Sequence, residues 1–270
     1  RRSLGRICLR DRGPGWSLVR RHLIEGVKEV FTQMERSSLD YIEPRNGSIA
    51  IGALTRHRTV EKSALLKELC PILPHAAEHV ADVQVRNRGT FGGSIAHADP
   101  AAEFCAAILL LGGKVVARSL KGTRQIPAEE FFVGPLMTSL EPTELVTEVL
   151  APRPCGQRWS FRSVAPRHGD LAIAGVMVLL DADNKGICTE VRIGMFGVGP
   201  TPLRAARAEA ILKGHDFDGR LIAQAAEEAA AETDPVSDVR ASADYRRDLV
   251  KGLVAWNLRN ASNKLAGGGS

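Results

Sequence analysis

One segment, residues 85–103, constrains the fold of this chain more than any other stretch. It contains Gly92 and Gly93, whose lack of a Cβ lets the backbone adopt a positive φ or lie against a ligand that a side chain would push away. Asp99 and Pro100 follow, and they predict the N-cap and the first position of an apolar helix whose N-terminal amides face the loop. Glycines, backbone amides and a helix start are what proteins offer to phosphate groups. A glycine pair alone is more often a tight connection without a ligand.

The sequence of this segment resembles that of a known family. It is similar to the signature R-G-T-(I/V/F)-G-G-(N/S)-(L/I)-x-H-A-D-P-A-A-E of the FAD-binding medium subunit of the molybdenum hydroxylases, which include the aerobic carbon monoxide dehydrogenase and xanthine dehydrogenase types. Five further stretches match the family in order along the chain: residues 51–57, 127–132, 167–172, 197–202 and 243–247. The resemblance covers the chain from Leu39 onward.

The resemblance implies a set of cofactor-binding residues. The phosphates and the ribityl chain of FAD would be lined by Thr90, Phe91, Gly92, Gly93 and Ser94. Glu103 would accept hydrogen bonds from flavin hydroxyls, Leu145 would pack at the isoalloxazine ring, and Arg162 would lie near the polar edge of that ring. Without the resemblance, Glu103 is interpreted as a first-turn acid favoured by the helix dipole, Leu145 as a core residue and Arg162 as a solvated one.

The N-terminal region departs from the family. The family's first phosphate-binding loop reads A-G-G-(Q/H/N)-S-L-(I/V)-P, and three residues of it are retained here: Gly15, Ser17 and Leu18. Pro14 removes a donor amide, and Trp16 places an indole where a small polar side chain is expected. We therefore interpret residues 1–38 as a divergent remnant of the first lobe. An aberrant or truncated N-terminus and true divergence are both open explanations.

Charge and composition exclude several function classes. The formal net charge of +5 equals the surplus of residues 1–36, which hold nine basic and four acidic side chains. The rest of the chain is therefore neutral, and only 5% of its residues are aromatic, so nucleic-acid binding is disfavoured. The five cysteines include no C-x-x-C pair, so an iron–sulfur cluster within this chain is also disfavoured.

No other motif offers catalytic chemistry. His97, Asp99 and Glu103 are metal-ligand types, but Asp99 is better used as a cap and His97 precedes Pro100, so we expect no metal site. The histidines His57, His75, His79 and His168 are interpreted as surface or capping groups. The chain lacks an apolar run of membrane-spanning length and a signal peptide, which predicts a cytoplasmic protein without a membrane span.

The expected fold class is α+β. It comprises a two-lobed FAD-binding domain of the molybdopterin dehydrogenase type over residues 39–152 and an α+β C-terminal domain over 157–262 with a three-stranded antiparallel sheet and helices, joined near 152–157. Residues 263–270 are expected to be a disordered tail. In the first domain we expect strands over 48–54, 114–119, 123–126 and 145–150, a helical stretch over 63–81 interrupted at Pro71 and Pro74, and a helix over 101–111. In the second we expect strands over 159–165, 172–181 and 187–197, the last two joined by a hairpin turn at 183–186. We expect helices over 203–213, 217–232 and 243–260.

The family implies a division of labour among subunits. A large molybdopterin subunit oxidises the substrate, an iron–sulfur small subunit carries two [2Fe–2S] clusters, and the FAD of this oxidoreductase subunit passes the electrons to an external acceptor. We expect a dimer of heterotrimers and no acid–base catalytic residue in this chain. Two alternatives are open: a flavin-free structural subunit of the same assembly, and a free-standing FAD oxidoreductase.

Overall fold

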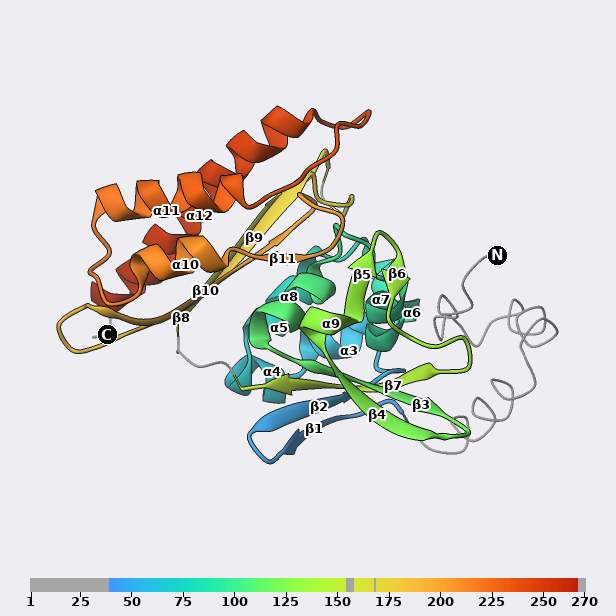
Figure 1. The fold of residues 1–270 in the computed structure, drawn as a ribbon. Coiled ribbons are helices and arrows are strands. Elements are labelled where there is room, and N and C mark those ends of the chain that lie inside the picture. The colour runs from blue at the N-terminus through green and yellow to red at the C-terminus, as the bar shows by residue number, and fades with distance from the viewer. Residues whose placement is uncertain (1–38, 154–157, 168, 267–270) are drawn as a thin grey trace.

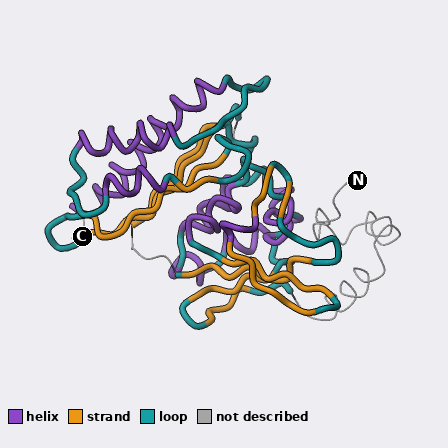
Figure 2. Tube along the Cα trace, in the orientation of Figure 1, coloured by secondary structure: helices purple, strands orange, loops and turns teal. Residues whose placement is uncertain are grey.

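The computed structural model describes residues 39–153, 158–167 and 169–266. Figure 1 shows two units: an N-terminal unit (residues 39–153, blue to green) and a C-terminal unit (residues 158–266, yellow to red). Each unit is built on an antiparallel sheet, and helices of the N-terminal unit lie between the two sheets (Figures 1 and 2). The α+β fold class expected from the sequence is confirmed.

The N-terminal sheet has five strands in the order β1-β2-β7-β3-β4. Their bounds are β1 Ile42–Arg45, β2 Ser48–Gly52, β7 Leu145–Pro152, β3 Lys114–Ser119 and β4 Gly122–Pro127. The β1–β2 hairpin turns at Asn46 and Gly47, which both have positive φ, as Asn-Gly turns require. All four strands expected in this unit are present. A small hairpin of β5 Phe132–Gly134 and β6 Met137–Thr138 follows the short helix α9 Ala128–Phe131.

The helices of the N-terminal unit lie mainly between β2 and β3 in the chain. Their bounds are α3 His57–Lys62, α4 Ala64–Leu69, α5 Ile72–His79, α6 Val83–Arg88, α7 Phe91–His97 and α8 Glu103–Leu111. The helical stretch expected over 63–81 forms two helices, α4 and α5, because the chain breaks at Cys70 and Pro71. The interruption expected at Pro71 is thus present, whereas Pro74 lies inside α5 without ending it. The helix expected over 101–111 begins two residues later, at Glu103, because the Asp99 side chain closes a turn onto the N–H of Ala101 (2.8 Å) instead of capping the helix.

The C-terminal sheet has the strand order β11-β10-β9-β8. Its strands are β8 Arg158–Val164, β9 Ala174–Ala182, β10 Cys188–Phe196 and the two-residue β11 Leu203–Arg204, which adds a fourth strand to the three expected. Asp183 accepts hydrogen bonds from the N–H groups of Lys185 and Ile187, and this closes the β9–β10 hairpin at the Asp-Asn-Lys-Gly sequence.

Three helices cover one face of this sheet: α10 Ala206–Leu212, α11 Gly219–Ala231 and α12 Ala243–Ala266 (Figure 1). Helix α12 continues four residues into the tail that was expected to be disordered, and residues 267–270 lie outside the described part of the chain. Among the helices described, none is long and apolar enough to cross a membrane.

Candidate functional site

The glycine-pair segment is built against residues 51–57, one of the stretches that resemble the family. The N–H of Phe91 donates to the carbonyl of Thr55 (2.8 Å), and the N–H of Gly92 donates to the carbonyl of Ala53 (3.1 Å). Arg56 and Thr90 form an antiparallel bridge between the two segments. Two of the matching stretches thus form one local structure.

The glycine pair does not form the positive-φ turn that the sequence suggested. Gly92 and Gly93 lie in the first turn of α7, and Thr90 caps this helix by accepting the N–H of Gly93 (3.2 Å). A Cβ on Gly92 would lie 2.5 Å from the Cβ of Ala53, so Gly92 is required for the close packing of α7 on the segment that follows β2. The N–H groups of residues 91–93 all donate within the chain.

His57 holds the residue that caps α7. Its Nε2 lies 2.9 Å from the carbonyl oxygen of Thr90, and its ring packs edge-on against Phe104. Burial lowers the pKa of His57 to about 4, so the ring is neutral at pH 7 and Nε2 carries the proton donated to Thr90. The expectation that His57 is a surface or capping group is therefore wrong. Its position within the matching stretch 51–57 was the available signal.

Glu103 is a buried carboxyl at the start of α8, with 6% of its surface exposed. Burial first, and then the carboxylate of Asp99, raise the pKa of Glu103 to about 8, while its own backbone N–H acts in the opposite direction. Within the described residues, no hydrogen bond from another side chain to this carboxyl is observed. A buried carboxyl in this state can accept hydrogen bonds from groups outside the chain.

The other cofactor-binding residues implied by the resemblance differ in where they lie relative to residues 90–103. Leu145 is buried at the start of β7, in the same apolar core as Phe91 and Phe104. Arg162 stacks on the ring of Trp256 in α12, 4.5 Å from the ring centroid, and the structure does not bring it to residues 90–103. The first-loop residues lie outside the described part of the chain: Gly15, Ser17 and Leu18.

The loop after β8 rests on the turn between α5 and α6. The backbone of Gly169 approaches Ala81 so closely that a Cβ there would lie 3.3 Å from the Ala81 carbonyl carbon. Arg86 holds this turn by donating to the carbonyls of Val80 and Ala81, and it pairs with Glu61 at 2.9 Å. Sequence reasoning missed the buried Arg86–Glu61 pair, because no local pattern marks two charges 25 residues apart.

Two further histidines lie between the units. The rings of His75 and His79 on α5 contact Phe161 of β8 at centroid distances of 5.3 and 4.5 Å, and His75 also contacts Trp159. Both rings are half-buried in an aromatic cluster at the contact between the units. The Nδ1 of His79 also lies 2.9 Å from the carbonyl oxygen of His75 in the last turn of α5, which agrees with the expected capping role. His168 lies outside the described residues.

Comparison with known families identifies both units. Residues 33–154 match the family described as the FAD binding domain in molybdopterin dehydrogenase, and residues 159–261 match the CO dehydrogenase flavoprotein C-terminal domain. This pair of domains defines the FAD-binding subunit of an oxidoreductase. The chain belongs to the family of FAD-binding medium subunits of the molybdenum hydroxylases.

Individual relatives agree with this assignment. The 6-hydroxypseudooxynicotine dehydrogenase complex subunit alpha of Paenarthrobacter nicotinovorans is 41% identical over 224 residues, which are 83% of this chain and 76% of that protein. The carbon monoxide dehydrogenase medium chain of Hydrogenophaga pseudoflava is 33% identical, covering 82% of this chain and 77% of the relative.

A solved structure shows the same fold. It is the carbon monoxide dehydrogenase from Hydrogenophaga pseudoflava in a form that lacks the Mo-pyranopterin moiety of the molybdenum cofactor. Its matching chain superposes with a TM-score of 0.81 at 32% identity, covering 90% of this chain and 89% of that chain. The family resemblance carried by the sequence motifs is confirmed.

Proposed function

We propose that this chain is the electron-transfer subunit of a molybdenum hydroxylase, whose FAD accepts electrons from the [2Fe–2S] clusters of a small partner subunit and passes them to an external acceptor. Oxidation of the substrate takes place in a large molybdopterin subunit, and the complex is a cytoplasmic dimer of heterotrimers. The family membership supports the role, and relatives named medium subunit or medium chain support the partners.

The observation that carries the flavin assignment to these residues is the Glu103 carboxyl. It is buried, its pKa is raised by that burial, and no described side chain donates to it. Hydroxyl groups of FAD supply such donors. Their hydrogen bonds favour the ionised form of the carboxyl, so binding would lower its pKa again and the bonds would be of the charge-assisted kind. Glu103 would hold the cofactor through these hydroxyls.

Two other residues implied by the resemblance are Ser94, within α7, and Leu145, at the start of β7. Ser94 is half-buried on α7 and offers a hydroxyl, whereas the amides of residues 91–93 are already used within the chain. Leu145 supplies apolar surface. When bound, FAD supplies the ability to exchange electrons singly or in pairs, and the chain's residues bind, orient and shield it.

The test is an FAD titration of the whole chain carrying Glu103→Gln. Loss of a hydrogen bond to a charged group costs about 1.5–3 kcal/mol, so we expect FAD to bind about ten to a hundred times more weakly. Glu130→Gln is the matched control, because Glu130 is exposed on the short helix α9. Equal dissociation constants for the two variants would remove Glu103 from the site.

Purified wild-type protein also distinguishes the proposed function from the two alternatives, a flavin-free structural subunit and a free-standing FAD oxidoreductase. Purified wild-type protein without the visible absorption of oxidised flavin would favour the flavin-free structural subunit. Flavin without co-purifying molybdenum and iron would favour the free-standing FAD oxidoreductase.

A further inference from the structure

Strand β10 of the C-terminal unit lies along helix α8, whose first residue is Glu103. Side chains alternate along β10, so Val191, Ile193 and Met195 face the helices of their own unit while the alternate positions face α8. Those alternate positions are Arg192, Gly194 and Phe196. Two of these positions, Arg192 and Gly194, lie directly against the helix that begins at Glu103.

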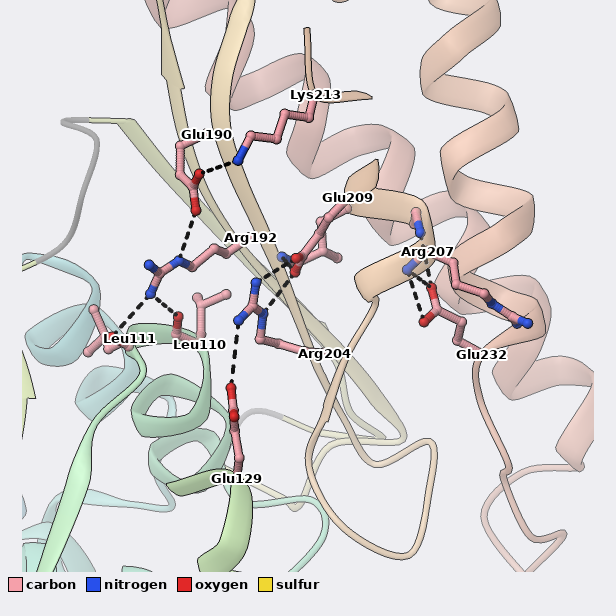
Figure 3. Close-up of polar contacts among 12 residues, drawn as sticks. Leu110, Leu111, Glu129, Glu190, Arg192, Arg204, Arg207, Glu209, Lys213 and Glu232 are labelled. Atoms are coloured by element: carbon pink, nitrogen blue, oxygen red, sulfur yellow. Dashed lines mark hydrogen bonds and ion pairs between the residues drawn. The ribbon is translucent and has the colours of Figure 1, made fainter. Parts of the chain in front are cut away.

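Arg192 binds the C-terminal end of α8. Its Nη1 donates to the carbonyls of Leu110 and Leu111 at 3.3 and 3.2 Å, which are among the last carbonyls of the helix (Figure 3). Helix α8 has no basic residue in its own last turn, so Arg192 supplies both the donor and the positive charge that a helix C-terminus favours. Glu190 lies 3.5 Å from the Arg192 Nε and is itself bound by Lys213, which orients the guanidinium.

A second contact holds the chain just before α8. The N–H of Gly197 donates to the carbonyl of Pro100 at 2.8 Å, three residues before Glu103. Gly197 has a φ of +75°, and Arg246 of α12 fixes it by donating to its carbonyl at 2.8 Å. Between the two ends, a Cβ on Gly194 would lie 3.3 Å from the Cβ of Leu110, so the helix rests directly on the strand.

We propose that Arg192 is a positioning residue for the flavin site, acting through α8 to fix the place of Glu103. A helix transmits an axial displacement over its length, and the nine residues of α8 span only about 13 Å. The C-terminal unit thereby sets how tightly the N-terminal unit holds its cofactor. This inference rests on the proposed function, because it assigns Arg192 to the same FAD site.

The experiment compares Arg192→Ala with Arg207→Ala in the complex as purified with its partner subunits. Arg207 is the matched control, since its guanidinium pairs with Glu228 at 2.8 Å entirely within the C-terminal unit. FAD dissociation is followed by the fluorescence of released flavin, and visible circular dichroism reports the surroundings of the bound ring. Thermal unfolding of the FAD-free protein sets a temperature at which every variant is folded.

We expect Arg192→Ala to weaken FAD binding roughly 5- to 20-fold, which is the lower part of the usual range of coupling between sites. The flavin dichroism should change as well. Arg192→Lys, which keeps a donor and the charge, should restore affinity to within about threefold, and Arg207→Ala should leave both readouts at wild-type values. Gly194→Ala shifts α8 by a few tenths of an ångström and should weaken binding in the same direction.

The outcomes distinguish the positioning role of Arg192 from the proposed function. Wild-type affinity and dichroism in both Arg192→Ala and Gly194→Ala would overturn the positioning role while leaving the proposed function intact. A wild-type complex that binds no FAD would overturn the proposed function itself. If Arg192→Ala does not fold, Gly194→Ala and Arg192→Lys decide the question alone.

Discussion

The two faces of the C-terminal sheet are used in different ways. The outer face, which includes Val176, Val178 and Met195, is buried under α10, α11 and α12 of the same unit. The inner face, which includes Phe161, Met177 and Phe196, belongs to the core of the N-terminal unit. The outer face therefore stabilises one unit, whereas the inner face joins two. The C-terminal unit therefore contributes side chains to the hydrophobic core of the N-terminal unit, which matches the FAD binding domain.

The inner face is also where the strands allow the least change. A Cβ on Gly175 would lie 2.0 Å from the Phe196 ring, so the space beside that ring exists only because residue 175 is glycine. The Phe196 ring in turn stacks on Phe161 with a centroid distance of 5.9 Å, and Phe161 contacts both histidines of α5. The contact is thus a continuous set of rings from β10 to α5.

The largest expected effect comes from removing one of these rings. Phe196→Ala should lower the free energy of unfolding by about 3–5 kcal/mol, because a fully buried aromatic side chain leaves a cavity. Since the cavity opens between the units, FAD affinity should fall as well. Urea unfolding followed by circular dichroism, together with an FAD titration, measures both quantities.

Met195→Ala is the control on the outer face. Met195 is fully buried against the helices of its own unit, so its removal also costs about 2–5 kcal/mol. FAD affinity under conditions where the protein is folded should remain that of the wild type. If Phe196→Ala and Met195→Ala lower FAD affinity equally, the two faces of the C-terminal sheet do not differ in their effect on FAD binding.

Local patterns predicted the longer strands of both units, because alternation and turn residues act over a few positions. The Asp-Asn-Lys-Gly turn after β9 is one example, since Asp183 accepts two nearby N–H groups. Four shorter strands were not predicted: β1, β5, β6 and β11. The short helices α3, α6 and α7 were not predicted, because six or seven residues carry too little periodicity.

The site was predictable only where the family signature names residues. The signature marked Thr90 and Glu103, but nothing local indicated that His57 would bind the Thr90 carbonyl or that Arg192 would bind the end of α8. These contacts join residues 33 and 82 positions apart. They depend on packing between segments, which a single sequence does not reveal.

The pH dependence of stability tests the burial of Glu103. Burial raises the pKa of Glu103 from 4.5 to about 8, so the FAD-free folded protein holds this proton more tightly than the unfolded chain does. Stability from this group is complete below pH 4.5 and is lost as the pH rises towards 8. Between pH 6.5 and 8 we expect a loss of about 1–2 kcal/mol, measured by urea unfolding at each pH.

Glu103→Gln should remove this slope, and a slope that persists in that variant would assign the proton to another group. The window above pH 6.5 avoids His57. Burial lowers the pKa of that ring to about 4, so its contribution to stability is already complete above its ordinary value of 6.5.

The smallest effect is expected on a helix that covers the outer face. Gly252 lies in the middle of α12, and a Cβ added there would meet no atom within 4 Å, so Gly252→Ala encounters no steric obstacle. Alanine loses less backbone entropy on folding than glycine, and we expect a gain of about 0.5–1 kcal/mol in the free energy of unfolding. FAD affinity should stay unchanged, because Gly252 is exposed and lies six residues from Arg246, through which α12 contacts Gly197. A gain in stability accompanied by a changed FAD dissociation constant would show that the outer helices also act on the site, and that the two faces are less separate than their cores indicate.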